Sequence, residues 1–447
     1  MMRTLSAIAR LTLREALRSR VVLVFALLLV LIAGLMPSLI KGDGTPVGDI
    51  RLTISYTLGT AFGLLALANL WTGCALISGD IASRTLALTR VKPVSPWQLW
   101  CGKWLGLLLL NFLFLAGLYT WTGAIAYHRI WHHGEAAAVM KTAREKVLPV
   151  LPALDEQIKY YFTLSKGAEK SGTEQRELLR QLRREIPYQT ATLERGQTWN
   201  WHFTLDHPPI PSTPIWLRFQ FDTDAYTRAI VKAQCRLTGV TSGSGIDFTL
   251  DDFSTRLFEV PVSAETFGAD KEFTLTMKHD GDASTGPLLL QPRQGLALLV
   301  PRETLLLNLL RSATIHFSIL ALLAAIGITL GTLFSLPAAA FCATGLLVSV
   351  LISAFVVDDF ELTSPLDPDA NVPPVQRVFA QFATETTRML THAAQPALAP
   401  VPLRQLAAAE QIPLAELRRA LLFNILLLPL VCCGMATAAL RRRELPS

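Results

Sequence analysis

The chain has 447 residues and a formal net charge of +6; 51% of its residues are hydrophobic and only 17% are charged. A soluble domain carries roughly 25% charged residues, so this composition argues against an ordinary water-soluble enzyme and favours a membrane protein. Nucleic-acid binding, which a pI near 9.0 could indicate, is also disfavoured. The basic residues are concentrated beside apolar segments and are not spread over a surface.

Six segments reach or approach the roughly 20 apolar residues with which a helix crosses a bilayer. They are residues 21–40, 54–77, 104–127, 309–334, 338–357 and 420–440. Basic residues gather before the first segment, between the second and third, and after the sixth. With six spans these three groups lie on one side, which the positive-inside rule identifies as the cytoplasm. Arg418 and Arg419, at the outer start of the sixth span, depart from this pattern.

We therefore predict an α-helical multi-pass protein of a bacterial inner membrane, with both termini in the cytoplasm. Residues 21–127 hold the first three spans in this prediction, and residues 305–357 hold the next two. Residues 419–447 then form the last span and a cytoplasmic tail.

Residues 1–20 have a pattern of their own. Their apolar residues recur at helical spacing, with four arginines mostly opposite, at Arg3, Arg10, Arg14 and Arg18. This pattern predicts an amphipathic helix in the plane of the membrane surface, with its arginines toward anionic lipid headgroups. The alternative is a plain basic extension of the first span. A cleaved signal peptide is disfavoured because no A-x-A site follows the apolar run.

Two long segments lie outside the membrane in this topology. Residues 128–195 are rich in helix-favouring residues, and a strong helix is predicted at 173–186. In residues 196–304 the apolar period changes to two, which predicts an antiparallel β-sandwich within an extracytosolic α+β insertion. The alternating residues are Trp199, Trp201, Phe203, Leu205, Leu217, Phe219, Phe221, Val231, Ala233, Cys235, Leu237, Ile246, Phe248, Leu250, Phe273, Leu275 and Met277. Residues 358–418 begin acidic and proline-rich, and short helices are predicted near 375–391 and 413–419.

Several aromatic residues of the outer segment could stack on sugars, as they do in carbohydrate-binding sandwiches. They are Trp199, Trp201, Trp216, Phe219, Phe221 and Tyr226. Strand alternation predicts that most of them face the core, so contact with a protein is at least as plausible as a sugar site.

The sequence lacks the common catalytic motifs. It contains no G-x-x-x-x-G-K-[ST], no G-x-S-x-G and no H-E-x-x-H, so we expect neither an enzyme nor a bound cofactor. His128 and His132 are four residues apart and could bind a metal, but Tyr127 and Trp131 favour an aromatic belt at the membrane surface. The six cysteines indicate no disulfide framework, because only Cys235 faces outward.

Four polar residues lie inside predicted spans, namely Asn69, Asn111, His316 and Asn424. Polar residues at this depth are costly and often line a substrate path. The alternative is hydrogen bonding between helices, worth about 0.6–2 kcal/mol each, which we favour for the asparagines. For His316 the two interpretations are evenly balanced, because an imidazole can change its charge.

Residues 78–106 join the second and third spans on the cytoplasmic side. This segment, with the residue before it, contains four short stretches, Ile77-Ser78-Gly79-Asp80-Ile81, Arg84-Thr85-Leu86, Lys92-Pro93-Val94-Ser95 and Gly102-Lys103-Trp104-Leu105-Gly106. With these stretches the segment resembles the cytoplasmic loop of ABC-2 type permeases, the membrane subunits of one class of ATP-binding-cassette transporter. In that family a segment like SGE-I-x-x-G-T-L is followed by L-x-x-P-V-S-R, a short helix and G-K-x-x-G. Asp80 stands where glutamate is more usual, Arg84 where glycine is often found, and the outer insertion is larger than in minimal members.

The resemblance implies that this loop docks into a separate nucleotide-binding subunit. The implied ATPase-coupling residues are Ser78, Gly79, Asp80, Arg84, Thr85, Lys92, Pro93 and Lys103. The implied partners are a cytoplasmic ABC ATPase, a second permease copy or homologue, and membrane lipid, without nucleic acid. Asp80 and Arg84 are four residues apart, so on a helix they share a face and could pair with each other or with the partner.

The predicted function is therefore the permease subunit of an ABC exporter, with ATP hydrolysed by a separate subunit. The alternative is a membrane-anchored receptor or assembly factor whose outer β-sandwich binds a ligand or polymer. A membrane-embedded enzyme is less favoured, because no paired acid and base or metal constellation is present.

Overall fold

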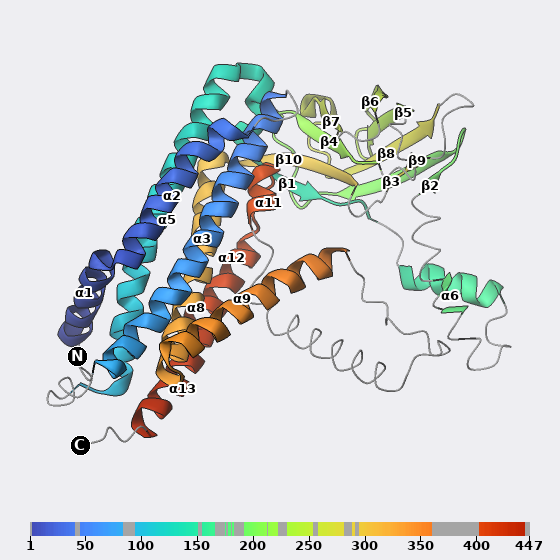
Figure 1. The fold of residues 1–447 in the computed structure, drawn as a ribbon. Helices are drawn as coiled ribbons and strands as arrows, with labels where there is room; N and C mark the ends of the chain where they lie inside the picture. The colour runs from blue at the N-terminus through green and yellow to red at the C-terminus, as the bar shows by residue number, and fades with distance from the viewer. Residues whose placement is uncertain are drawn as a thin grey trace. The chain divides into compact units, whose positions relative to one another are not determined.

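A computed structural model divides the chain into two compact units (Figure 1). The first, here called the helical unit, comprises Met1–Lys141 and Thr304–Ser447, and the second, the β unit, comprises Thr142–Glu303. The structure describes residues 2–40, 45–83, 94–150, 154–165, 175, 178–179, 181–182, 192–211, 213–221, 230–253, 258–280, 288–290, 295–359 and 402–442.

The helical unit is built from long apolar helices. Its elements are α1 (Met2–Arg18), α2 (Arg20–Leu39), α3 (Pro46–Ala82), α5 (Pro96–His133), η1 (Gly134–Lys141), α8 (Leu305–Leu333), α9 (Leu336–Asp359), α11 (Leu403–Ala407), α12 (Leu414–Leu421), η4 (Leu422–Leu427) and α13 (Leu428–Arg442). Among the described residues, five helical stretches are long and apolar enough to cross a membrane by length and composition. The fifth predicted span, residues 338–357, lies within α9. Side chains are described only for the first part of this helix, and there Leu336–Ser349 forms a shorter apolar stretch.

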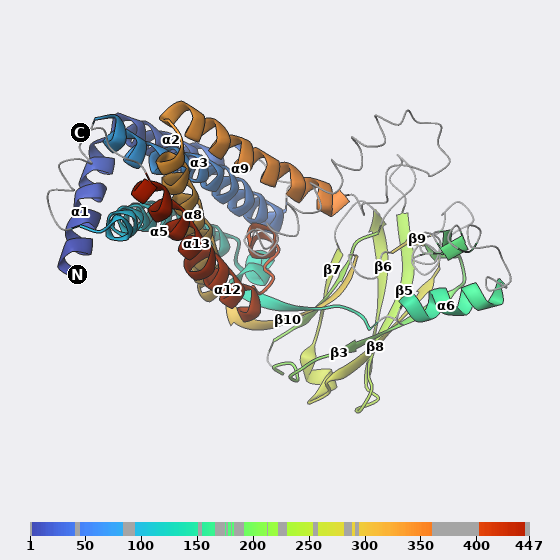
Figure 2. The same ribbon diagram turned by 90° about the horizontal axis from the view of Figure 1, so that it is seen from below.

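The centre of the helical unit is α8, which lies among α3, α5, α9 and α13 (Figure 2). In the most apolar 18-residue stretch of α8, 72% of the residues are buried, whereas in that of α2 only 11% are buried. Glycines allow α3 and α8 to approach closely. A Cβ atom added at Gly327 would lie 2.7 Å from the Leu70 carbonyl oxygen, and one at Gly331 would collide with the carbonyl of Cys74. Small residues at such crossings let two helix backbones pack directly against each other.

Residues Met2–Arg18 of the predicted amphipathic segment form helix α1. Its location at a membrane surface stays a prediction. Helix α1 is separate from α2, because Ser19 has extended backbone angles of φ −67° and ψ 128° between the two helices. The structure therefore does not support the alternative, a plain extension of the first span. The apolar face of α1 packs against α5, while its four arginines are exposed.

The last predicted span is interrupted. After α12, which follows Pro413 as predicted, residues Leu422–Leu427 form the π-helical turn η4 before α13 begins. Pro429 lies just beyond this turn. Proline has no N–H group and its ring crowds the carbonyl four residues earlier, so a locally widened helix accommodates it.

The β unit contains two four-stranded antiparallel sheets around one hydrophobic core. One sheet has the order β1-β10-β4-β7 and the other β3-β8-β5-β6, and β2 pairs with β9. The strands are β1 (Thr142–Val147), β2 (Thr192–Leu193), β3 (Thr198–Thr204), β4 (Ile215–Phe219), β5 (Ile230–Gly239), β6 (Gly245–Phe253), β7 (Phe258–Val262), β8 (Glu272–His279), β9 (Leu288–Leu289) and β10 (Leu296–Thr304). The core takes side chains from both sheets, as in a sandwich.

The alternation predicted from the sequence is confirmed. The core holds every predicted inward residue, with Trp199, Ile246 and Phe248 partly buried beside it. The predicted helical segment 128–195 needs correction, because Thr142–Val147 is strand β1. Its composition favours a helix, but pairing within a sheet overrides that weak local preference.

Other parts of the predicted outer segments are described only in pieces. Helix α6 (Leu154–Leu164) lies in the predicted helical segment. Of the helix predicted at 173–186, the described residues 175, 178–179 and 181–182 are helical. The helix predicted at 375–391 lies outside the described residues. Strands β7 and β10 were not predicted.

Candidate functional site

The candidate site lies where α3 ends and α5 begins. Ser78, Gly79 and Asp80 lie in the last turns of α3, and Lys103 lies in the second turn of α5. The start of α5 is held by a local bond, because the Ser95 amide donates to Oε1 of Gln98 at 3.1 Å. Such a bond satisfies one of the amide groups that a helix start leaves open. The other predicted coupling residues, Arg84, Thr85, Lys92 and Pro93, lie outside the described residues.

A buried ion pair connects the two helices at this site. Lys103 Nζ lies 2.5 Å from Asp80 Oδ2 and donates to the Leu76 carbonyl oxygen at 2.6 Å. The Lys103 side chain is only 5% exposed and that of Asp80 26%. An ammonium group at this depth requires a charged or polar partner. The sequence suggested Arg84 or a separate subunit as the partner of Asp80, and the structure adds Lys103.

The two glycines of the G-K-x-x-G motif, Gly102 and Gly106, lie where α1 packs against α5. A Cβ atom on Gly102 would lie 2.6 Å from Cγ2 of Ile8, and one on Gly106 would lie 2.8 Å from the Ala9 carbonyl oxygen. Only glycine therefore permits α1 to sit this close to α5. The lysine holds α3 and the glycines accept α1, so the motif joins three helices.

A second set of contacts, in the same turn of α5, reaches the last helix. The Trp100 indole N–H donates to Oγ1 of Thr329 at 3.3 Å, and Trp100 is 1% exposed. The Thr329 hydroxyl lies 2.8 Å from the Ala325 carbonyl oxygen and 3.3 Å from that of Cys432. One hydroxyl on α8 thus links α5 to α13, and Trp100 lies one helical turn from Lys103 in α5.

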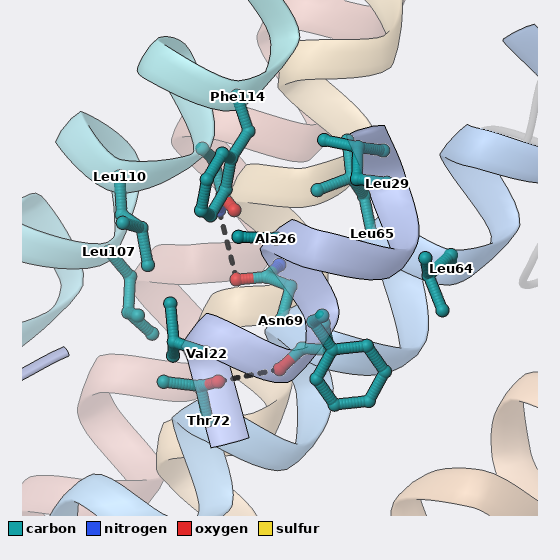
Figure 3. Close-up of a pocket in the computed structure, with 13 residues that line it drawn as sticks. Val22, Ala26, Leu29, Leu64, Leu65, Asn69, Thr72, Leu107, Leu110 and Phe114 are labelled. Carbon is teal, nitrogen blue, oxygen red and sulfur yellow. Dashed lines mark hydrogen bonds between the residues drawn. The ribbon is translucent and has the colours of Figure 1, made fainter. Parts of the chain in front are cut away.

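Asn69 and Asn111 bond to each other between α3 and α5. Nδ2 of Asn111 donates to Oδ1 of Asn69 at 2.9 Å, and Nδ2 of Asn69 donates to the Leu320 carbonyl oxygen of α8 at 2.6 Å. The pair borders a cavity of about 20 Å³ beneath α2 (Figure 3). That volume holds about one water molecule. These contacts favour helix-to-helix bonding over a substrate path for the two asparagines.

His316 belongs to a separate cluster. The Tyr119 hydroxyl hydrogen-bonds to Nδ1 of His316 and lies 2.7 Å from Oγ of Ser312. The Phe62 ring packs on the imidazole with centroids 4.1 Å apart. Within the described part of the chain, Nε2 of His316 has no hydrogen-bond partner.

Asn424 lies in the π-helical turn, and its Nδ2 donates to Oγ of Ser318 at 3.3 Å. The four predicted polar residues thus fall into three clusters, each bonded to α8. Tyr119 and Thr329 were missed by the sequence analysis, although a hydroxyl inside an apolar span was the signal that could have revealed them.

The opposite end of α8 binds a chain segment that precedes α12. Oδ1 of Asn308 accepts from the Ile412 amide at 2.9 Å, and Nη1 of Arg311 donates to the Ile412 carbonyl oxygen at 2.8 Å. Ala409 in this segment has a positive φ of 53°, and Ile412 is fully buried. The segment therefore forms a fixed cap over the end of α8.

The other predicted sites are not assembled as binding sites. His128 and His132 have ring centroids 4.4 Å apart, but the described residues contain no group of three or more metal-ligating side chains. In the β unit Trp201, Phe219 and Phe221 are buried, so they cannot stack on a sugar. Tyr226 lies outside the described residues.

Charged and thiol groups of the β unit are also enclosed. Glu259 accepts from Arg144 at 3.0 Å and from Arg218 at 2.9 Å, and the three residues join strands β1, β4 and β7. Burial raises the pKa of the Cys235 thiol to about 12. This thiol is therefore protonated at neutral pH, and its enclosure in the core keeps solvent oxidants away from it.

Together these features define a bundle of long apolar helices, and a two-sheet β unit is inserted in its sequence between Lys141 and Thr304. No protein-family model matches the chain, and neither a curated protein nor a solved structure matches it.

Proposed function

We propose that this chain is the membrane-spanning permease subunit of an ABC-2 type exporter. The observation that carries the proposal is the Lys103–Asp80 ion pair. This pair joins α3 to α5, the two helices that flank the basic segment 84–93. A segment that docks into a moving ATPase transmits force only if its two flanking helices do not slide past each other. In this proposal the Lys103–Asp80 pair supplies the bracing that a docking element needs.

In this proposal ATP is hydrolysed by a separate cytoplasmic subunit, because the sequence contains no P-loop. With the six spans that the sequence predicts, both termini and residues 84–93 would lie in the cytoplasm and the β unit outside it. In ABC-2 transporters one six-helix unit supplies half of a translocation path. We therefore expect a second permease copy or homologue, which together with lipid covers the exposed sides of α2 and Leu414–Arg442.

The proposal is tested by purifying the tagged full chain in mild detergent and identifying its partners by mass spectrometry. We expect an ATPase with Walker motifs and a second permease chain. Recovery of the chain with other envelope proteins and no ATPase would favour a receptor or assembly factor instead.

The docking contact is tested with the double variant Arg84→Ala, Lys92→Ala, because substitution of Asp80 would also disturb its ion pair with Lys103. Loss of two interface charges should weaken ATPase binding about tenfold, equivalent to ~1.4 kcal/mol. The control variant Arg441→Ala, Arg442→Ala removes two positive charges from the same predicted side. Equal ATPase recovery with both variants would refute docking through residues 84–93.

A further inference from the structure

Two cysteines that are far apart in the sequence lie side by side in the helical unit. Cys101 belongs to α5 and Cys433 to α13, and their sulfur atoms are 4.0 Å apart. Both residues are half-buried. A sequence with no disulfide framework gave no reason to pair them, because 332 positions separate them.

We propose that Cys101 and Cys433 form a reversible oxidation site, at which a disulfide bond joins α5 to α13. A disulfide has an S–S length of about 2.05 Å, so the two sulfur atoms must approach by about 2 Å. Helices α5 and α13 are also linked near these thiols through Thr329 of α8, which bonds to Trp100 and to the Cys432 carbonyl oxygen. Rotation of the two side chains can supply most of the approach without separating the helices.

Cys432, the neighbour of Cys433, tests whether disulfide formation is selective for Cys433. Cys432 is adjacent to Cys433, but successive residues of a helix point about 100° apart. Its carbonyl oxygen faces Thr329 on α8. Cys74 is fully buried in α3, and the Cys235 thiol is enclosed in the core of the β unit. Disulfide formation should therefore select Cys101 and Cys433 over Cys74, Cys235 and Cys432. Cys342 of α9 is exposed, and the peptide map distinguishes it from the proposed pair.

The chemistry balances with hydrogen peroxide as the oxidant. One thiolate attacks peroxide, its sulfur becomes a sulfenic acid, and hydroxide leaves as water after protonation. The second thiol then attacks the sulfenic sulfur, the S–S bond forms, and a second water leaves. Two thiols and one peroxide thus give one disulfide and two waters, and a dithiol reverses the reaction.

The consequence rests on the proposed function. The disulfide would lie beside the Trp100–Thr329 bond and within one turn of Lys103, where docking of an ATPase must be transmitted to the spans. It would hold α13 against α5 and prevent any relative motion of these helices. We infer that the oxidised protein loses most of its coupled ATPase activity and regains it on reduction. Transient disulfides of this kind are the form in which cytosolic proteins use thiol pairs for sensing.

The test begins with the full chain in membrane vesicles. After treatment with hydrogen peroxide, free thiols are blocked with N-ethylmaleimide, and peptides are mapped by mass spectrometry without reduction. We expect a Cys101–Cys433 linked peptide in the unchanged protein and in Cys432→Ser. It should be absent from Cys433→Ser, from the apolar variant Cys433→Ala, and after dithiothreitol. Alkylation of both thiols, or linkage of Cys101 to Cys432, would overturn the proposal.

A second measurement compares ATPase activity of the assembled transporter before and after oxidation, with Cys433→Ala as the control that should keep its activity. Unchanged activity in protein that carries the mapped disulfide would refute the regulatory consequence. Absence of any associated ATPase would count against the proposed function alone, because the peptide map does not depend on transport.

Discussion

Lys103 is the residue on which the candidate site depends most directly. Its ammonium group is buried between α3 and α5, where it contacts both the Asp80 carboxylate and the Leu76 carbonyl oxygen. A buried charge is tolerated only with such partners, because transfer from water to a protein interior costs several kcal/mol. The lysine therefore fixes the distance between two helix ends that the basic segment connects.

We predict that Asp80→Ala destabilises the helical unit by up to about 3 kcal/mol, because it leaves the buried Lys103 ammonium without its carboxylate. The partial exposure of Asp80 allows water to recover some of this loss. Thermal unfolding in detergent, followed by size-exclusion chromatography with fluorescence detection, measures the effect. Glu15→Ala removes an exposed carboxylate from α1 and should leave the midpoint unchanged. Equal midpoints for the two variants would show that the pair does not support the fold.

Helix α1 shows how an amphipathic pattern in the sequence is used in packing between helices. Its amphipathic period was visible in the sequence, and the structure shows that its buried face is formed by Ile8, Ala9, Thr12 and Ala16. That face packs on Gly102 and Gly106 of α5. The opposite face, with the four arginines, remains exposed for the lipid contact that the sequence predicts.

We predict that Gly106→Val displaces α1 from α5, because a Cβ atom at this position would lie only 2.6 Å from Cβ of Thr12. Overpacking of this kind costs about 1–3 kcal/mol. Cleavage by trypsin at Arg10 and Arg14 should become several-fold faster. Gly117→Val is the matched control on the same helix, since an added Cβ meets nothing within 4 Å there. If both variants are cleaved at the same rate, the close α1–α5 contact is refuted.

At the scale of the whole molecule, the chain consists of one unit inserted into another. The β unit begins after Lys141 and ends before Thr304, and it has its own hydrophobic core. The strand pairs Trp201 to Leu275 and Cys235 to Met277 bring together residues that are more than 40 positions apart. We expect pairing of this kind to make the unfolding of the β unit cooperative.

We predict that residues 142–303, expressed alone, fold with a cooperative transition and a stability of about 5 kcal/mol or more. The core side chains that stabilise it lie between residues 193 and 300. Circular dichroism and urea unfolding measure this, and Leu275→Asp, at a fully buried core position, should abolish the transition. A gradual, uncooperative loss of signal in the unchanged fragment would refute independent folding.

The sequence by itself determined the elements whose physics is local. Apolar runs of sufficient length predicted the positions of the long helices, a period of two predicted the inward residues of the sandwich, and the arginine pattern predicted α1. The strand β1 was not accessible in this way. It depends on pairing with distant parts of the chain, which local preference does not encode.

Only the tertiary structure decided which side chains meet. The sequence identified Asp80 and Lys103 as parts of one motif, and the fold made them a buried ion pair. It also placed Cys101 beside Cys433 and gathered the polar residues of the spans around α8. Helical spacing predicts neighbours within one helix, whereas a contact between helices depends on where each crosses the other. In this chain the glycines of α3, α5 and α8 permit those close crossings.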